Sequence, residues 1–105
     1  MTLPFRTESE AAAELEEATA WYDQQRPGLG DEFLEAVDEA LAFIANWPRT
    51  GRPVPDVPPD LLIRRAPVRR FPYHIVYLEM PGAIRILAFA HDRRSPGYWR
   101  TRVTR

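Results

Sequence analysis

Apolar side chains in the first half of the chain recur every three or four residues, which is the spacing of one face of an α-helix. Two such stripes lie on either side of Pro27-Gly28, a pair that ends helices. The spacing of Thr7 and Glu10 is that of a capping box at a helix start. We therefore predict a helical hairpin over residues 8–47, with buried stripes formed by Ala11, Leu15, Ala18, Tyr22, Phe33, Val37, Ala40, Ile44 and Trp47.

The second half of the chain follows a shorter period. Three apolar runs, residues 61–68, 71–80 and 83–90, alternate between two sets of side chains, as strands do. Both sets are largely apolar, so these strands are expected at the centre of a sheet. The short MPG turn makes the last two an antiparallel hairpin. We predict an α+β fold with an N-terminal strand at residues 1–6, then the helical hairpin, then a three-stranded antiparallel sheet over residues 61–90 packed on the hairpin.

The other residues form a loop and a tail. Five prolines between residues 48 and 60 exclude a helix and a central strand there, so we expect a proline-rich loop. Residues 91–105 follow the last strand as a basic C-terminal tail. The 105 residues suffice for one small domain, so we expect residues 1–105 to form a single domain.

Composition limits the chemistry of the chain. It has no cysteine, which excludes a disulfide and a thiolate nucleophile. Its two histidines, His74 and His91, are far apart in sequence, so we expect no metal site and no cofactor. No apolar run reaches the roughly 20 residues of a membrane span, and the first ten residues do not resemble a signal peptide. We expect a cytoplasmic protein that does not bind membranes.

Charge is segregated along the chain. Residues 1–47 hold 11 acidic and 2 basic side chains, a net charge of −9, whereas residues 48–105 hold 12 basic and 4 acidic ones, a net charge of +8. A small domain with this division has an acidic side and a basic side. All 14 basic residues are arginine, whose planar fork suits phosphate and carboxylate groups better than the ammonium of lysine does.

The segment AHDRRSPGYWRTR, residues 90–102, concentrates basic and aromatic groups. Arginines interleaved with Tyr98 and Trp99 suit nucleic-acid backbones and bases, and they suit an acidic peptide equally well. Pro96-Gly97 makes a turn, so the end of this segment is also able to fold back onto the domain. In that case Trp99 is a packing anchor.

Three segments, taken in order, carry a family resemblance. They are EATAWYDQQRPGLGDEFLEAVDEALAFIANWP with its Pro-Gly turn, IRRAPVRRFPYHIVY with its Phe-Pro-Tyr between arginines, and IRILAFAHDRR with its His-x-x-Arg. Together they resemble the RelE/ParE superfamily of bacterial toxins, and ParE-like members more than RelE-like ones. The resemblance covers residues 3–102. It implies a toxin domain and a cognate antitoxin, which we expect to be a ribbon-helix-helix protein encoded next to it.

The resemblance leaves three functions open, because the superfamily holds two mechanisms on one fold. ParE-like members inhibit DNA gyrase by binding it, and RelE-like members cut mRNA on the ribosome. The third possibility is an inactive member that only binds its antitoxin. RelE-like toxins use a lysine and arginine cluster, whereas this chain has no lysine and carries His74 in the place of an arginine. We therefore expect gyrase inhibition rather than RNA cleavage.

Candidate residues follow for each function. The catalytic residues of a nuclease would be His91, Arg93, Tyr98, Arg65 and His74. The residues expected to bind the target are Arg70, Arg93, Arg94, Trp99, Arg100 and Arg102. Those expected to bind the antitoxin are Trp21, Tyr22, Phe33 and Trp47, with packing inside the hairpin as the alternative. We expect His91 to be the better proton acceptor, since the neighbouring cations favour its neutral form, with a structural role as the alternative.

Overall fold

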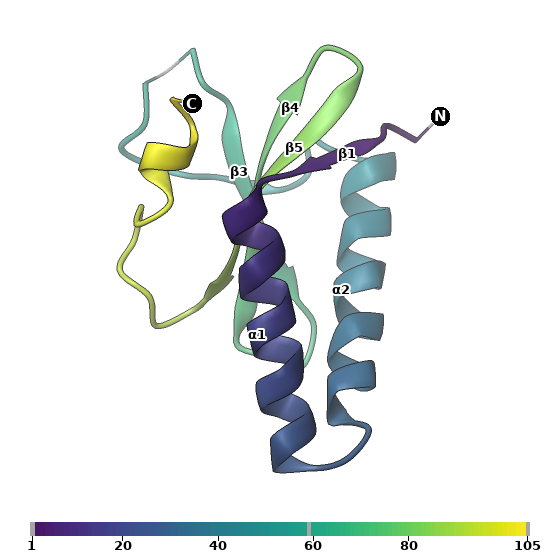
Figure 1. The fold of residues 1–105 in the computed structure, drawn as a ribbon. Coiled ribbons are helices and arrows are strands. Elements are labelled where there is room, and N and C mark those ends of the chain that lie inside the picture. Colours follow the sequence, from purple (N-terminus) through teal and green to yellow (C-terminus); the bar gives the residue numbers. More distant parts are fainter. Residues whose placement is uncertain (1, 59, 105) are drawn as a thin grey trace.

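Two antiparallel helices lie against one face of a twisted sheet in the computed structural model (Figure 1). The structure describes residues 2–58 and 60–104. Residues 1, 59 and 105, which belong to the expected strand, loop and tail, lie outside the described residues. The elements in chain order are β1 (Phe5–Thr7), α1 (Ser9–Gln25), α2 (Leu29–Asn46), β2 (Arg52–Pro53), β3 (Ile63–Val68), β4 (Tyr73–Met80), β5 (Ala83–His91) and the short 3-10 helix η1 (Arg100–Arg102).

The α+β fold is confirmed, but the sheet formed by the described residues has five strands where the sequence predicted three. Their order is β1-β5-β4-β3-β2. β1 runs parallel to β5, with Phe5 opposite Ile84, and all other neighbours are antiparallel. β2 lies within the expected proline-rich loop. Its Pro53 is tolerated because β2 is an edge strand, where a missing N–H need not remove a ladder hydrogen bond.

α1 starts at Ser9, so the predicted capping box at Thr7 is wrong. Thr7 ends β1 opposite Ile86, and the Glu8 N–H donates to the Ile86 carbonyl at 3.0 Å. Glu8 occupies the N-cap position without a side-chain capping bond. Its carboxylate instead accepts a hydrogen bond from Arg85 Nη2 at 2.7 Å. The pairing of β1 with β5 thus determines where the helix begins.

The tip of the helical hairpin depends on glycine. Gly28, between the helices, has a φ of 90°, in the left-handed region that glycine adopts without strain. Gly30 N–H donates to Asp23 Oδ1 at 2.8 Å. A Cβ at residue 30 would lie 2.8 Å from the Thr19 carbonyl oxygen. The absence of a side chain therefore lets α2 begin directly against the last turns of α1.

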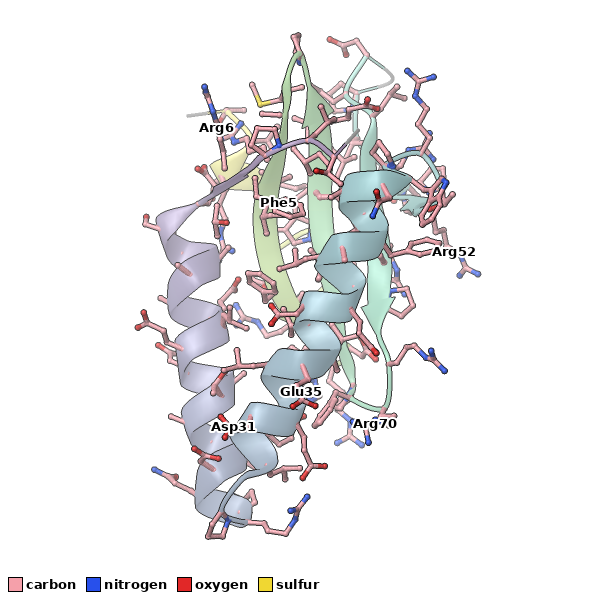
Figure 2. All side chains as sticks on the ribbon, turned by 90° about the vertical axis from the view of Figure 1, so that its right-hand side faces the viewer. Phe5, Arg6, Asp31, Glu35, Arg52 and Arg70 are labelled. Atoms are coloured by element: carbon pink, nitrogen blue, oxygen red, sulfur yellow. The ribbon has the colours of Figure 1, made fainter. Side chains whose placement is uncertain are left out.

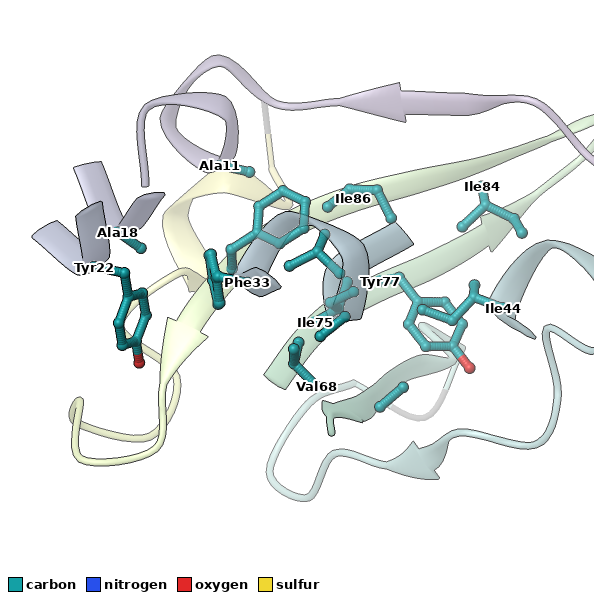
Figure 3. Packing of buried hydrophobic residues seen from close by; sticks show 14 residues of the cluster. Ala11, Ala18, Tyr22, Phe33, Ile44, Val68, Ile75, Tyr77, Ile84 and Ile86 are labelled. Carbon is teal, nitrogen blue, oxygen red and sulfur yellow. The ribbon is translucent and has the colours of Figure 1, made fainter. Parts of the chain in front are cut away.

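The main core lies between the hairpin and the sheet (Figure 3). The predicted helical stripes are buried or half-buried there, except for Trp47, which follows the end of α2 and is 57% exposed. Four aromatic rings, from Tyr22, Phe33, Phe71 and Tyr73, contact one another with centroids 5.0 to 6.2 Å apart. These contacts hold the turn between β3 and β4 against the hairpin.

The C-terminal segment covers the opposite face of the sheet. After β5 the chain turns at Gly97, which has a φ of 78°. Trp99 then packs on Leu87, Ala88 and Ala90 and is only 3% exposed. The turn and the packing role of Trp99 that the sequence indicated are both present. The small alanine side chains of β5 leave room for the indole to lie close to the sheet.

Glu14 of α1 ties this segment to the rest of the domain. Its Oε2 accepts hydrogen bonds from the Tyr98 hydroxyl at 2.6 Å and from Arg102 Nη2 at 3.1 Å. Its Oε1 accepts from Arg102 Nη1 at 2.9 Å and from the Phe89 N–H at 3.2 Å. Arg102 Nη1 also donates to the Leu87 carbonyl. Burial alone would lower the pKa of Arg102, but the hydrogen bonds and charge of Glu14 raise it above its ordinary value.

We predict that Glu14→Ala lowers the free energy of unfolding by about 3–5 kcal/mol, because it leaves the nearly buried Arg102 without its counter-charge. Glu17→Ala, which removes an exposed carboxylate from the same helix, should change it by less than about 0.5 kcal/mol. Denaturant unfolding followed by tryptophan fluorescence measures both values. Equal effects of the two substitutions would contradict the proposed role of Glu14.

We also predict a loss of stability in alkali. Burial raises the pKa of all four tyrosines, Tyr22, Tyr73, Tyr77 and Tyr98, above 10.0, and for Tyr98 the hydrogen bond to Glu14 adds to this. The folded chain therefore keeps protons that the unfolded chain loses, so stability falls as pH rises above 10. Tyrosinate absorbance and circular dichroism should change together during a pH titration. Tyrosine ionisation near pH 10 in a chain with native circular dichroism would contradict this prediction.

Candidate partner-binding site

A groove of about 900 Å³ lies between the C-terminal half of α2 and β3. It exists because β2 pairs only with Arg64 and Arg65, so the second half of β3 extends beyond it. One wall is mainly apolar and comes from α2, and the other carries three arginines. The lining residues are Glu39, Ala40, Ala42, Phe43, Ile44, Thr50, Gly51, Arg52, Arg65, Ala66, Pro67, Arg69, His74, Tyr77 and Asp92.

Two exposed aromatic residues stand at the α2 side of this groove, Phe43 in its lining and Trp47 against Phe43 but outside the lining. Phe43 is 50% exposed and Trp47 is 57% exposed, with their ring centroids 5.4 Å apart. Trp47 was expected to bind a partner, whereas Phe43 was missed. Phe43 lies off the predicted buried stripe of α2, and an aromatic residue on the polar side of an amphipathic helix is the signal that could have identified it. Exposed aromatic pairs of this kind are typical of protein interfaces.

A buried tyrosine shapes the other end of the groove. The Tyr77 hydroxyl donates to the Pro48 carbonyl at 2.8 Å and accepts from the Gly51 N–H at 3.1 Å. Arg64 Nη1 donates to the Gly51 carbonyl at 3.0 Å. A Cβ at residue 51 would collide with the Tyr77 hydroxyl, so glycine is required at this position. These bonds fix the start of the proline-rich loop and leave Arg52 free to line the groove.

Two of the five residues expected for a nuclease, Arg65 and His74, come together in this groove. Arg65 pairs with Val76 and His74 with Pro67, so both lie on the same side of the sheet. This is the side away from the helical hairpin, where Val76 packs with Trp99, so the two residues line the part of the groove that continues around the edge of β3. His74 Nδ1 lies 2.8 Å from Asp92 Oδ1. The carboxylate accepts a hydrogen bond from Nδ1–H, which leaves Nε2 of the neutral ring as a proton acceptor. This arrangement orients a histidine as a general base.

His91 has a different environment. Its Nδ1 accepts a hydrogen bond from the Arg93 N–H at 3.0 Å, so the neutral ring carries its proton on Nε2 and its acceptor nitrogen is already occupied. The ring packs edge-on against Tyr73, which belongs to the main core. It does not line the groove. This geometry supports the structural alternative for His91 over its use as a proton acceptor.

The C-terminal candidates divide into buried and exposed residues. Trp99 and Arg102 are buried, and the Tyr98 hydroxyl is bonded to Glu14, so these three side chains stabilise the fold rather than present a surface to a target. The remaining candidate cations are exposed, namely Arg70, Arg93, Arg94 and Arg100. The guanidinium of Arg94 lies over the Tyr98 ring, 3.8 Å from its centroid. Exposed cations therefore remain, but they do not form a site together with His91 and Tyr98.

The aromatic residues expected to bind an antitoxin also divide into buried and exposed ones. Tyr22 and Phe33 are buried in the main core, in agreement with the packing alternative. Trp21 is 56% exposed on α1, edge-on to Tyr22. Only Trp21 and Trp47 of the four therefore offer surface to a partner.

Within residues 2–58 and 60–104, no group of three or more His, Cys, Asp or Glu side chains could hold a metal ion. In the same part of the chain, no helix has the length and apolar character to cross a membrane. The site is thus a groove of apolar and cationic side chains with one histidine–carboxylate pair.

Comparisons with known proteins agree with this fold. The sequence profile described as the ParE toxin of the type II toxin–antitoxin system parDE matches residues 5–96. A solved structure titled as the chromosomal ParDE TA system from P. aeruginosa superposes with a TM-score of 0.70 at 18% identity, covering 86% of this chain and 96% of the other. Among curated proteins, no sequence matches significantly. This chain belongs to the ParE toxin family of type II toxin–antitoxin systems.

Proposed function

We propose that the chain is a cytoplasmic toxin that inhibits DNA gyrase by binding it and is neutralised by a cognate antitoxin. Membership of the ParE family carries this proposal. The side chains add support, because the five residues considered for RNA cleavage do not converge and the exposed cations suit binding. Arg70, Arg93, Arg94 and Arg100 would contact the target.

The antitoxin would occupy the groove between α2 and β3. Its apolar side chains would meet Phe43 and Trp47, and its carboxylates would meet the arginines of the opposite wall, in the manner of a helix or extended segment in a groove. Trp21 would receive a further part of the antitoxin on α1. We expect a ribbon-helix-helix protein, encoded adjacent to the toxin, in this role.

One observation favours a second function, a ribosome-dependent endoribonuclease. The Nδ1 proton of His74 is held by Asp92, and Arg65 and Arg69 line the same groove. A base with nearby fixed cations is what cleavage by a 2′-hydroxyl needs. The missing lysine cluster weighs against this function.

Expression without antitoxin should arrest growth, and the purified toxin should block supercoiling by gyrase while ribosome-bound mRNA stays intact. Paired supercoiling and translation assays on the same preparation measure both activities. Site-specific cuts in ribosome-bound mRNA that disappear in His74→Ala, and persist in His91→Ala, would replace gyrase inhibition with the nuclease function. Inactivity in both assays would favour a member that only binds its antitoxin.

We predict that Phe43→Ala and Trp47→Ala each weaken antitoxin binding about tenfold or more, because exposed aromatics in a groove act as interface anchors. Leu62→Ala provides a matched control, since Leu62 is 62% exposed and belongs neither to the groove lining nor to the Phe43–Trp47 ring pair. Titration calorimetry with the purified antitoxin measures the three affinities. Equal affinities would exclude the groove as the docking site.

A further inference from the structure

Four exposed arginines meet at one end of the sheet. Arg69 and Arg70 belong to the turn between β3 and β4, and Arg93 and Arg94 follow the end of β5. The two loops are joined directly, because the Asp92 N–H donates to the Pro72 carbonyl at 2.9 Å. We call these four residues the arginine tip. Figure 2 shows Arg70 at the lower end of the sheet and Arg6 near the opposite end.

The first loop of the arginine tip is held firmly by its neighbours. Phe71 packs edge-on against Tyr22 and Phe33 in the core. Its N–H donates to the Val68 carbonyl, and its carbonyl accepts from the Tyr73 N–H at 2.8 Å. The backbone of this turn is therefore fixed while the side chains of the two arginines extend into solvent.

The second loop is fixed in the same manner. The Arg93 N–H donates to His91 Nδ1, and the Arg94 N–H donates to the His91 carbonyl, both at 3.0 Å. The Arg94 guanidinium rests on the ring of Tyr98, whose hydroxyl is bonded to Glu14. Both loops thus present their cations from an ordered backbone, which reduces the entropy lost on binding.

Arg70 adopts a backbone conformation that does not favour arginine. Its φ is 71°, in the left-handed region where a side chain is strained and glycine is not. Strain of this type persists at functional sites when the side chain is needed for another purpose. Within the described residues, the Arg70 guanidinium has no ion-pair partner, and its ring contact is a distant one with Phe71, at 5.9 Å from the centroid. The fold therefore gives no reason for arginine at this position.

The charges of the arginine tip are not neutralised by direct ion pairs among the described residues. None of its four guanidinium groups forms an ion pair in the part of the chain that the structure describes. The nearest carboxylate in sequence is Asp92, which is bonded to His74. The net negative charge lies on the helical hairpin, and Figure 2 shows Asp31 and Glu35 on the part of α2 towards the same lower end as Arg70. Because the four guanidinium groups are exposed and form no ion pair with these acids, they are available to a polyanion.

We propose that the arginine tip binds the phosphate backbone of duplex DNA directly and without sequence preference, so that Arg70, Arg93 and Arg94 would contact the DNA held by the target. Arginine forks bind phosphates in a bidentate manner. Phe71 and Tyr98, the aromatic rings nearest the tip, are packed against the domain, so the tip has no exposed ring on which unpaired bases could stack, which favours a duplex over a single strand. The choice of DNA over RNA rests on the proposed function, since gyrase works on duplex DNA.

Binding of the full-length toxin to a short fluorescent DNA duplex of arbitrary sequence tests the proposal. We expect the logarithm of the association constant to fall with the logarithm of salt concentration with a slope of about −3 to −4, given about −0.9 for each phosphate contacted. The double variant Arg70→Gly/Arg93→Ser should flatten that slope by about 2. Its thermal midpoint should stay close to that of the wild type, since Arg70→Gly relieves backbone strain.

The matched control is Arg6→Ser/Arg49→Ser, which removes the same charge from exposed residues outside the tip. This control should keep the wild-type slope. Equal slopes in the two double variants, or tighter binding to an RNA duplex, would overturn the proposal. Displacement of the DNA by poly-glutamate at equal charge concentration would also overturn it, in favour of an acidic protein surface.

The assay contains no gyrase, so it separates this inference from the function on which it rests. A toxin that inhibits gyrase but does not bind duplex DNA refutes the inference alone. A toxin that binds DNA through the arginine tip but leaves supercoiling unaffected refutes the proposed target alone.

Discussion

The carboxylate of Glu14 is bonded to three residues in two other parts of the chain, and the arrangement of the domain depends on it. From α1 it receives hydrogen bonds from the β5 backbone at Phe89 and from two side chains of the C-terminal segment, Tyr98 and Arg102. A carboxylate this far from water is tolerable only when its oxygens are satisfied and its charge is paired, and both conditions hold here. The helical hairpin, the sheet and the tail are thereby joined at one point.

Glu14 also binds a backbone group at the edge of the sheet that no neighbouring strand covers. β1 covers β5 only from Ile84 to Ile86, which leaves the second half of β5 beyond the end of its neighbour. There the Phe89 N–H is bonded to Glu14 and the Leu87 carbonyl to Arg102, so these two groups are not available to another strand. At the other edge, Pro67 lacks an N–H and β2 is short. The surfaces that stay accessible to a partner are the groove beside β3 and the loops at the end of the sheet.

Arginine has two distinct uses in this chain. Arg85 and Arg102 are largely buried, and each bonds a carboxylate and at least one backbone carbonyl at once, which suits a planar fork with five donors better than a single ammonium group. The arginines of the tip and of the groove are exposed. The sequence alone does not distinguish a buried arginine from an exposed one, because burial depends on which carboxylate each residue contacts in the folded chain.

The sequence was sufficient for the helical hairpin, the three long strands and the family, because periodicity and local turn chemistry depend on neighbouring residues. It left Trp99 between target binding and packing, and the fold decides for packing. It misjudged the start of α1, since the pairing of Thr7 with Ile86 overrides a local capping signal. It also preferred His91 over His74, and here only the tertiary structure decides. Asp92 lies 18 positions after His74, and the role of each imidazole follows from which of its nitrogens the fold already occupies.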